Sequence, residues 1–187
     1  GDPGDLVVKS NDTHLQSGEI IVRSRAAGKV PGVRFIKNKP DEKSTFEVSR
    51  GGSITSEVKS TGAGSEIKIE HDDMNWEDIK ITSLASGDGA GSGVSIKGNR
   101  LFTRGDIISS VSSKNVGGDI EIEVDDVTVK NGKIHSVNTI SRHSTSKGGD
   151  ITIKANSFTV LNGGATYSET IGIGKGTVSL DDFENRK

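Results

Sequence analysis

The stretch GGDIEIEVD at residues 117–125 decides the fold, because it returns as GGDITIKAN at residues 148–156. In both copies one polar residue separates two apolar residues, and an Asp or Asn follows three positions after the second. Such alternation is typical of a β-strand, in which successive side chains point to opposite faces. A strand that recurs in the same form indicates a protein built from stacked repeats.

Four earlier stretches have the same form, and a weaker match lies near the end of the chain. The earlier copies are Leu6/Val8/Asn11, Val33/Phe35/Asn38, Ile67/Ile69/Asp72 and Val94/Ile96/Asn99. The weaker match begins at Val178 and Leu180, and its turn at Asp181 and Asp182 is shorter. The longest gap between copies contains the polar, Pro-bearing segment 38–45, which we interpret as a loop insertion.

Two further elements follow in most copies. The first ends at a glycine, as at Gly18, Gly132 and Gly163, where we expect the chain to turn through positive φ. The second is rich in Ser and Thr and leads to the next copy, as in residues 135–147. Each copy therefore consists of three short extended pieces, and no segment has the apolar 3.6-residue period of a helix.

Three short strands cannot bury their own apolar face, but stacked copies bury a continuous core. We therefore predict an all-β fold, a single parallel β-helix (β-solenoid) domain of six to seven rungs over residues 1–187. The chain begins without methionine and is in pattern almost at once, so we expect it to be a fragment of a longer repeat protein.

The composition restricts the classes of partner. The 24 basic and 26 acidic residues nearly cancel to a net charge of −2, so no attraction to nucleic acid or to an anionic membrane is expected. No apolar run approaches the roughly 20 residues that a membrane span needs. There is no cysteine, which excludes disulfides and thiolate chemistry.

Alignment of the copies predicts an inner, a turn and an outer column. The inner column holds the apolar pairs, including Leu6 and Val8, whose branched side chains suit a buried pleated surface. The outer column alternates in charge, and it runs Glu70, Lys97, Glu123 and Lys154. Opposite charges on adjacent strands favour in-register stacking. We expect Ser and Thr to line the exposed columns, as at Ser109, Ser110, Ser112, Ser136 and Ser141.

The turn column carries an Asp or Asn in every copy, namely Asn11, Asn38, Asp72, Asn99, Asp125 and Asn156. Such side chains can bond their own backbone and tolerate left-handed geometry, so we interpret the column as turn-forming. Calcium binding is the alternative, but Asn dilutes the charge and the glycine-aspartate nonapeptide of calcium-binding β-rolls is absent.

The residue pattern predicts no catalytic, cofactor-binding or metal site. The histidines His14, His71, His135 and His143 have no metal-ligand spacing and are expected at the surface. The pairs Asp72/Asp73 and Asp125/Asp126 could supply an acid and a base, but a turn role explains them, and we expect no charged pair in a cleft with a shifted pKa. Trp76 and Tyr167 could stack on sugars, although core or edge packing explains single aromatic residues better.

The repeats GGDIEIEVDDVTVKNGKIHS (117–136) and GGDITIKANSFTVLNGGATYS (148–168) resemble those of filamentous-haemagglutinin-type exoproteins of two-partner secretion systems. The resemblance covers residues 64–176 well and the first 60 residues loosely. It implies a right-handed parallel β-helix, export through a partner pore in the bacterial outer membrane, and a role in adhesion or cell contact. The family's amino-terminal secretion motif has no match, so the resemblance implies an internal portion, and no site residue carries over.

We therefore expect a non-enzymatic structural or adhesive module on the bacterial cell surface or outside the cell. Its expected partners are a host or neighbouring-cell surface, protein or glycan, and the export pore. The alternative is a carbohydrate-active β-helix, similar to polysaccharide lyases or hydrolases, with acids and bases on one exposed face. Fold alone cannot decide between these, because function resides in sites.

Overall fold

The computed structural model of this chain describes residues 4–24, 31–59, 66–85, 93–111, 118–138, 149–170 and 178–181. Every regular element in these ranges is a β-strand, which confirms the predicted all-β class. The strands are β1 (Leu6–Lys9), β2 (Asp12–Gln16), β3 (Glu19–Ser24), β4 (Val33–Ile36), β5 (Thr45–Ser49), β6 (Gly52–Val58), β7 (Ile67–Glu70), β8 (Asp73–Trp76), β9 (Ile79–Ala85), β10 (Val94–Thr103), β11 (Asp106–Val111), β12 (Ile120–Lys130), β13 (Lys133–Asn138), β14 (Ile151–Lys154), β15 (Ser157–Leu161), β16 (Ala165–Thr170) and β17 (Val178–Asp181).

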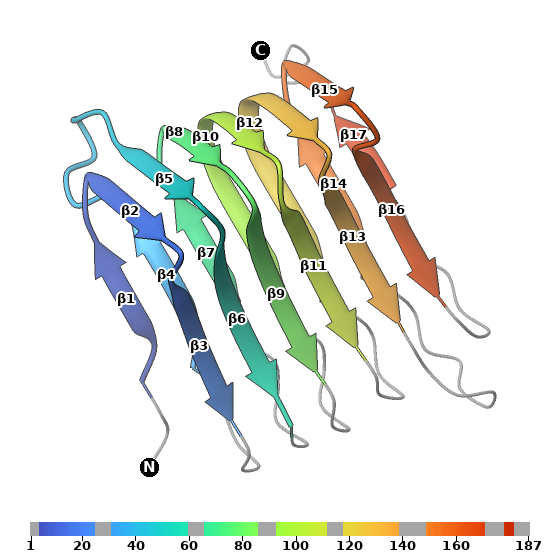
Figure 1. Cartoon of the computed structure of the whole chain (residues 1–187), viewed down its shortest axis with the longest axis horizontal. Helices are drawn as coiled ribbons and strands as arrows, with labels where there is room; N and C mark the ends of the chain where they lie inside the picture. The colour runs from blue at the N-terminus through green and yellow to red at the C-terminus, as the bar shows by residue number, and fades with distance from the viewer. Residues whose placement is uncertain are drawn as a thin grey trace.

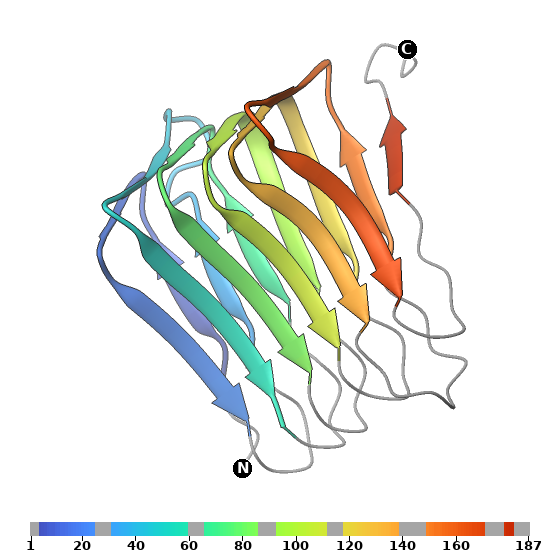
Figure 2. The same cartoon turned by 45° about the vertical axis from the view of Figure 1, so that its right-hand side comes forward.

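The strands form two parallel sheets in which each strand pairs with its counterpart in the next repeat. An 11-stranded sheet follows the order β1-β4-β7-β10-β12-β14-β17, with β2, β5, β8 and β15 beside this path. A 6-stranded sheet has the order β16-β13-β11-β9-β6-β3. The repeats therefore stack as the turns of a β-solenoid, with the chain progressing from one end of the stack to the other (Figure 1) and the same order visible from the side (Figure 2).

The predicted inner pairs stack in register along the whole path. Leu6 pairs with Val33, Val33 with Ile67, and the series continues through Val94, Ile120 and Ile151 to Val178. The weak final copy, which begins at Val178, therefore lies in register beside the copy that begins at Ile151. In two repeats the first and second extended pieces run on without a break, as the long strands β10 and β12.

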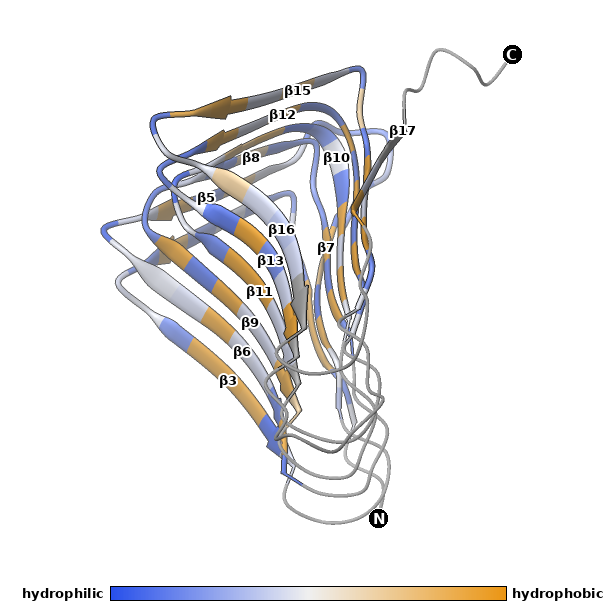
Figure 3. Ribbon diagram, turned by 90° about the vertical axis from the view of Figure 1, so that its right-hand side faces the viewer, coloured by the Kyte–Doolittle hydropathy of each residue, from blue (hydrophilic) through white to orange (hydrophobic). Residues whose placement is uncertain are grey.

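Viewed along the stack, strands line three sides around a shared interior (Figure 3). A large cluster of buried apolar side chains runs through it, and Val58 and Ala85 form a second, small cluster. In the large cluster, Phe46 packs against both Phe35 and Trp76 with ring centroids 5.1 and 5.8 Å apart. Full burial of such a side chain is worth about 1.5–3 kcal/mol. Leu6 differs from the prediction and remains 40% exposed, because β1 has a partner strand on one side only in the described ranges.

The serines of the second sheet lie inside the coil, contrary to the prediction for Ser109 and Ser136. Both are buried, and pairing places them in one ladder with Ser56 and Ser83. Ser110 is half-buried, whereas Ser112 and Ser141 lie outside the described residues. Serine is small enough to fit the narrow interior. The polarity of its side chain predicts an exposed position and does not account for this fit.

The left-handed turns also differ from prediction. Gly163 has φ of 80°, but at the two other predicted glycines the positive φ belongs to the preceding residues, Ser17 and Asn131. None of the Asn/Asp turn column has positive φ. Gly105 is needed because two backbones approach closely at this position. A Cβ on Gly105 would lie 1.7 Å from the Ile79 carbonyl oxygen.

The outer charged column stacks as predicted, but only part of it pairs straight up the stack. Lys97 lies opposite Glu70 and Glu123, and its ammonium is 2.8 Å from the Glu123 carboxylate. Lys154 instead pairs diagonally with Glu121, and Glu70 pairs with Lys68 of its own strand. The alternation therefore supports the register through a mixture of straight and diagonal contacts.

Candidate functional site

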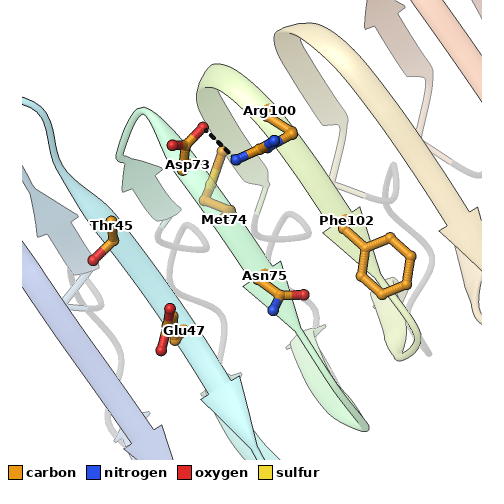
Figure 4. Close-up of a pocket in the computed structure, with 7 residues that line it drawn as sticks. All are labelled: Thr45, Glu47, Asp73, Met74, Asn75, Arg100 and Phe102. Carbon is orange, nitrogen blue, oxygen red and sulfur yellow. Dashed lines mark ion pairs between the residues drawn. The ribbon is translucent and has the colours of Figure 1, made fainter.

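The outer face of β5, β8 and β10 carries a two-by-three grid of side chains. Pairing aligns Thr45 with Asp73 and Asp73 with Arg100, and in the next outward row Glu47 with Asn75 and Asn75 with Phe102. These six residues, with Met74, line a hollow of about 410 Å³ (Figure 4). The grid exists because residues two apart in a strand share a face and the three strands stack in register.

Ion pairs organise the first row of the grid. An oxygen of Asp73 lies 3.4 Å from Arg100, and its other oxygen lies 2.7 Å from Lys43. Thr45 donates a hydrogen bond of 2.8 Å to the Asp12 carboxylate one repeat below. The Asp73 side chain is 20% exposed, whereas that of Arg100 is 65% exposed, so the guanidinium projects from the surface and the carboxylate is held near its base.

The second row combines one aromatic ring with two polar groups. Phe102 is half-buried on an outward position, and the Arg104 guanidinium lies 5.9 Å from the ring centre. Glu47 lies 3.2 Å from the His14 ring nitrogen. Asn75 is exposed, and its amide makes no hydrogen bond to another described residue. The hollow thus offers an apolar surface beside an exposed amide that has no hydrogen-bond partner among the described residues.

A second hollow lies around the corner, beside the loop between β4 and β5. Its volume is about 360 Å³, and its lining includes Pro40 from the loop together with Lys37, Asp72 and Lys97. Asp72 holds both ends of the loop, because its carboxylate is 2.8 Å from the Lys37 ammonium and 2.8 Å from the Ser44 amide nitrogen. One carboxylate therefore closes the segment that we interpret as an insertion.

Asn11 holds the same loop from the repeat below. Its side-chain oxygen accepts hydrogen bonds from the backbone amides of Asn38 and Lys39, at 3.2 and 3.0 Å. Its amide nitrogen donates a bond of 2.8 Å to Glu42. The side chains of Asn11 and Asp72 therefore form hydrogen bonds to the backbone of a neighbouring repeat. For this column the sequence pattern predicts hydrogen bonds to each residue's own backbone instead.

The Asp72–Lys37 pair corrects the expectation that no charged pair in a cleft has a shifted pKa. Burial alone would raise the pKa of Asp72, but hydrogen bonds from Lys37 and Ser44 outweigh it, and the pKa lies below the ordinary aspartate value. The pair faces a hollow as a functional pair would, yet its contacts fix a loop. The groups are already committed to each other and to the backbone.

His71 is buried, which contradicts its predicted surface position. It is 1% exposed, neither ring nitrogen has a hydrogen-bond partner among the described residues, and the ring packs against Phe46 at 5.7 Å. Burial lowers the pKa of His71 below its ordinary value, and the Asp72 carboxylate offsets part of this effect. Burial therefore favours the neutral imidazole, although the charged Lys37 and Asp72 line the same hollow as His71.

The remaining residues considered from the sequence do not form one site. His14 is exposed at the edge of the grid, His135 stacks on Tyr167 with ring centroids 5.1 Å apart, and His143 lies outside the described residues. Trp76 is in the core, as expected. The one side-chain hydrogen bond of Asp125 to another described residue is its contact of 3.5 Å with Asn156.

No protein family, curated protein or solved structure matches this chain. The described ranges contain no group of three or more His, Asp or Glu residues placed to hold a metal ion. Nor do they contain a helix long and apolar enough to cross a membrane. What the site can do must therefore follow from its own side chains.

Proposed function

We propose that this chain is a surface-presenting module of an exported bacterial repeat protein, a rigid β-helical stalk that makes contacts with a cell surface. One observation carries the proposal: in-register apolar ladders make up most of the interior, while a ladder of alternating charges runs along the outer face. Stacked repeats of this kind provide long, stiff surfaces for binding. The proposal includes six to seven rungs, taken from the number of sequence copies, together with a right-handed coil and an extracellular location, which are drawn from the resemblance to filamentous-haemagglutinin-type repeats.

Adhesion of coated beads tests this proposal. Beads carrying the folded chain are expected to attach to epithelial or bacterial cells more than beads carrying heat-denatured chain, because binding needs the stacked surface. Equal attachment of the two kinds of bead to every cell type would contradict a surface-contact role.

A carbohydrate-active enzyme is the second candidate, and the grid is the observation that favours it. Glu47, Asp73 and Arg100 line one hollow, and glycoside cleavage commonly uses two carboxylates on either side of the bond. Asp73 is already ion-paired with Lys43 and Arg100, and Glu47 lies 3.2 Å from the His14 ring nitrogen. A screen for reducing ends or unsaturated uronates released from polysaccharides decides between the candidates: turnover abolished by Asp73→Asn supports the enzyme, and no turnover supports the surface module.

A further inference from the structure

We propose that the grid on β5, β8 and β10 binds a short, uncharged stretch of glycan, with Phe102 as the stacking surface. This inference rests on the proposed function, because a surface module needs a place of contact. It adds the place, the ligand class and the residues responsible.

The dimensions of the grid suit sugar rings. A volume of about 410 Å³ falls in the range of roughly 300–1,000 Å³ that is usual for small-molecule sites. Three adjacent parallel strands span about 10 Å between the outer two axes. This span accommodates two linked pyranose rings lying across the strands, and the shallow outer face leaves both chain ends of a longer glycan unobstructed by the grid.

Phe102 gives the site its apolar surface. The other members of its outward row in neighbouring repeats are polar, namely Glu47, Asn75 and Thr128. Phe102 stays partly exposed even with the Arg104 guanidinium 5.9 Å from its ring centre, so a ligand that covers the exposed part of the ring would bury further apolar area. The C–H face of a pyranose ring has the shape and chemistry to do so, and its hydroxyl groups then point sideways toward the polar neighbours.

The polar neighbours retain free hydrogen-bonding capacity. Asn75 lies between Glu47 and Phe102, and its amide can both donate to and accept from sugar hydroxyls (Figure 4). Within the described ranges, the Arg100 guanidinium has one ion-pair contact, of 3.4 Å to Asp73, although a guanidinium has five N–H donors. Sugar hydroxyls act as donor and acceptor at once, so they match this mixture of groups.

Charge selects an uncharged glycan over an acidic one. The grid holds two carboxylates, Glu47 and Asp73, against the guanidinium of Arg100, which is paired with Asp73. The neighbouring cations Lys43 and Arg104 are paired as well, with Asp73 and Glu77 respectively. A uronate or sulfate would meet these carboxylates, and like charges brought together weaken binding. Acidic polysaccharides are therefore expected to bind less well than neutral ones.

The test begins with an array of uncharged and acidic oligosaccharides probed with the purified chain. The best uncharged ligand is then titrated calorimetrically against four proteins: the unsubstituted chain, Phe102→Ala, Asn75→Ala and Thr159→Ala. We expect Phe102→Ala to lower the affinity by about tenfold or more, and Asn75→Ala by several-fold. Thr159→Ala is the matched control in the same outward row and should change nothing, and equal melting temperatures establish that all four proteins are folded.

Three outcomes would overturn the inference. These are an array with no bound uncharged oligosaccharide, a preference for acidic glycans, and equal affinity of the Phe102→Ala and unsubstituted chains. Adhesion of Phe102→Ala beads separates the two proposals. If cells still attach to the Phe102→Ala beads, the grid is not the place of contact, but the surface-module proposal stands. If cells do not attach to beads carrying the unsubstituted chain, the surface-module proposal itself is wrong.

Discussion

Asp72 and Ser44 bind each other reciprocally across adjacent repeats. The Asp72 carboxylate accepts hydrogen bonds from the Ser44 amide at 2.8 Å and from its hydroxyl at 3.1 Å, while the Asp72 amide donates to the Ser44 hydroxyl at 2.9 Å. Ser44 is buried, so this pairing is largely shielded from water. It anchors the end of the β4–β5 loop to the next turn of the coil.

Asp72→Asn is expected to lower the free energy of unfolding by about 1–3 kcal/mol, because it removes the charge that Lys37 and Ser44 bind. Asp125→Asn, in the same column, should cost less than about 0.5 kcal/mol, since its one side-chain contact is long. Urea denaturation followed by circular dichroism measures both. Similar losses at the two positions would show that the loop contacts contribute nothing special.

The burial of His71 leads us to expect that the free energy of unfolding depends on pH. Burial lowers its pKa in the folded chain, Asp72 and Asp12 act in the opposite direction, and Lys37 adds to the lowering. The unfolded chain therefore takes up a proton near the ordinary value of about 6.5 while the folded chain resists it. The contribution of His71 to stability should be constant above that pH and fall as the pH drops below it, until the folded-state pKa is reached.

His71→Leu should remove this acid-dependent loss and raise stability at neutral pH, because it eliminates two unsatisfied buried nitrogens. His14→Leu is the control, since His14 is exposed and lies on the outer face. Melting temperatures between about pH 5 and 8 report both effects. An unchanged pH profile in His71→Leu would contradict the buried neutral imidazole.

The inner and outer columns should differ sharply in their response to truncation. Ile122→Ala is expected to cost about 2–5 kcal/mol, because Ile122 is fully buried and a cavity remains. Lys97→Ala should cost well under about 1 kcal/mol despite its contact with Glu123, because the lysine is 45% exposed and solvent screens the pair. Equilibrium denaturation gives both values, and equal losses would reverse the inside and outside assignment.

Gly105→Ala should destabilise the chain by about 2 kcal/mol or more, since its Cβ would collide with the carbonyl of Ile79 in the repeat below. Gly4→Ala is the control, because nothing lies within 4 Å of its added Cβ. Thermal melting distinguishes the two variants. A Gly105→Ala chain as stable as the control would mean that the backbones are not stacked so closely.

The stack could be predicted from sequence because alternation and repetition both appear in the apolar pairs that end at Ile151 and Ile153. The grid does not follow from the first strand of each repeat, because its residues lie on the second strand, where the repeat is looser. Its signal is the alternation of inward and outward residues in TFEV, DMNW and RLFT at residues 45–48, 73–76 and 100–103. Polarity does not predict the positions of Ser109 and His71, because a narrow coil also buries small or uncharged polar side chains.

Engineered disulfides test the parallel, in-register stack most directly, because the chain contains no cysteine of its own. Thr128 and Thr159 lie opposite each other on β12 and β15, whereas Ser157 is opposite Asp126. Adjacent positions are about 4.8 Å apart and positions offset by two residues about 8 Å, beyond the usual reach of a disulfide. Under mild oxidation, Thr128→Cys with Thr159→Cys should close almost completely, and Thr128→Cys with Ser157→Cys should not, as measured by mass spectrometry after thiol alkylation. Closure of the offset pair in preference to the aligned pair would contradict the stack.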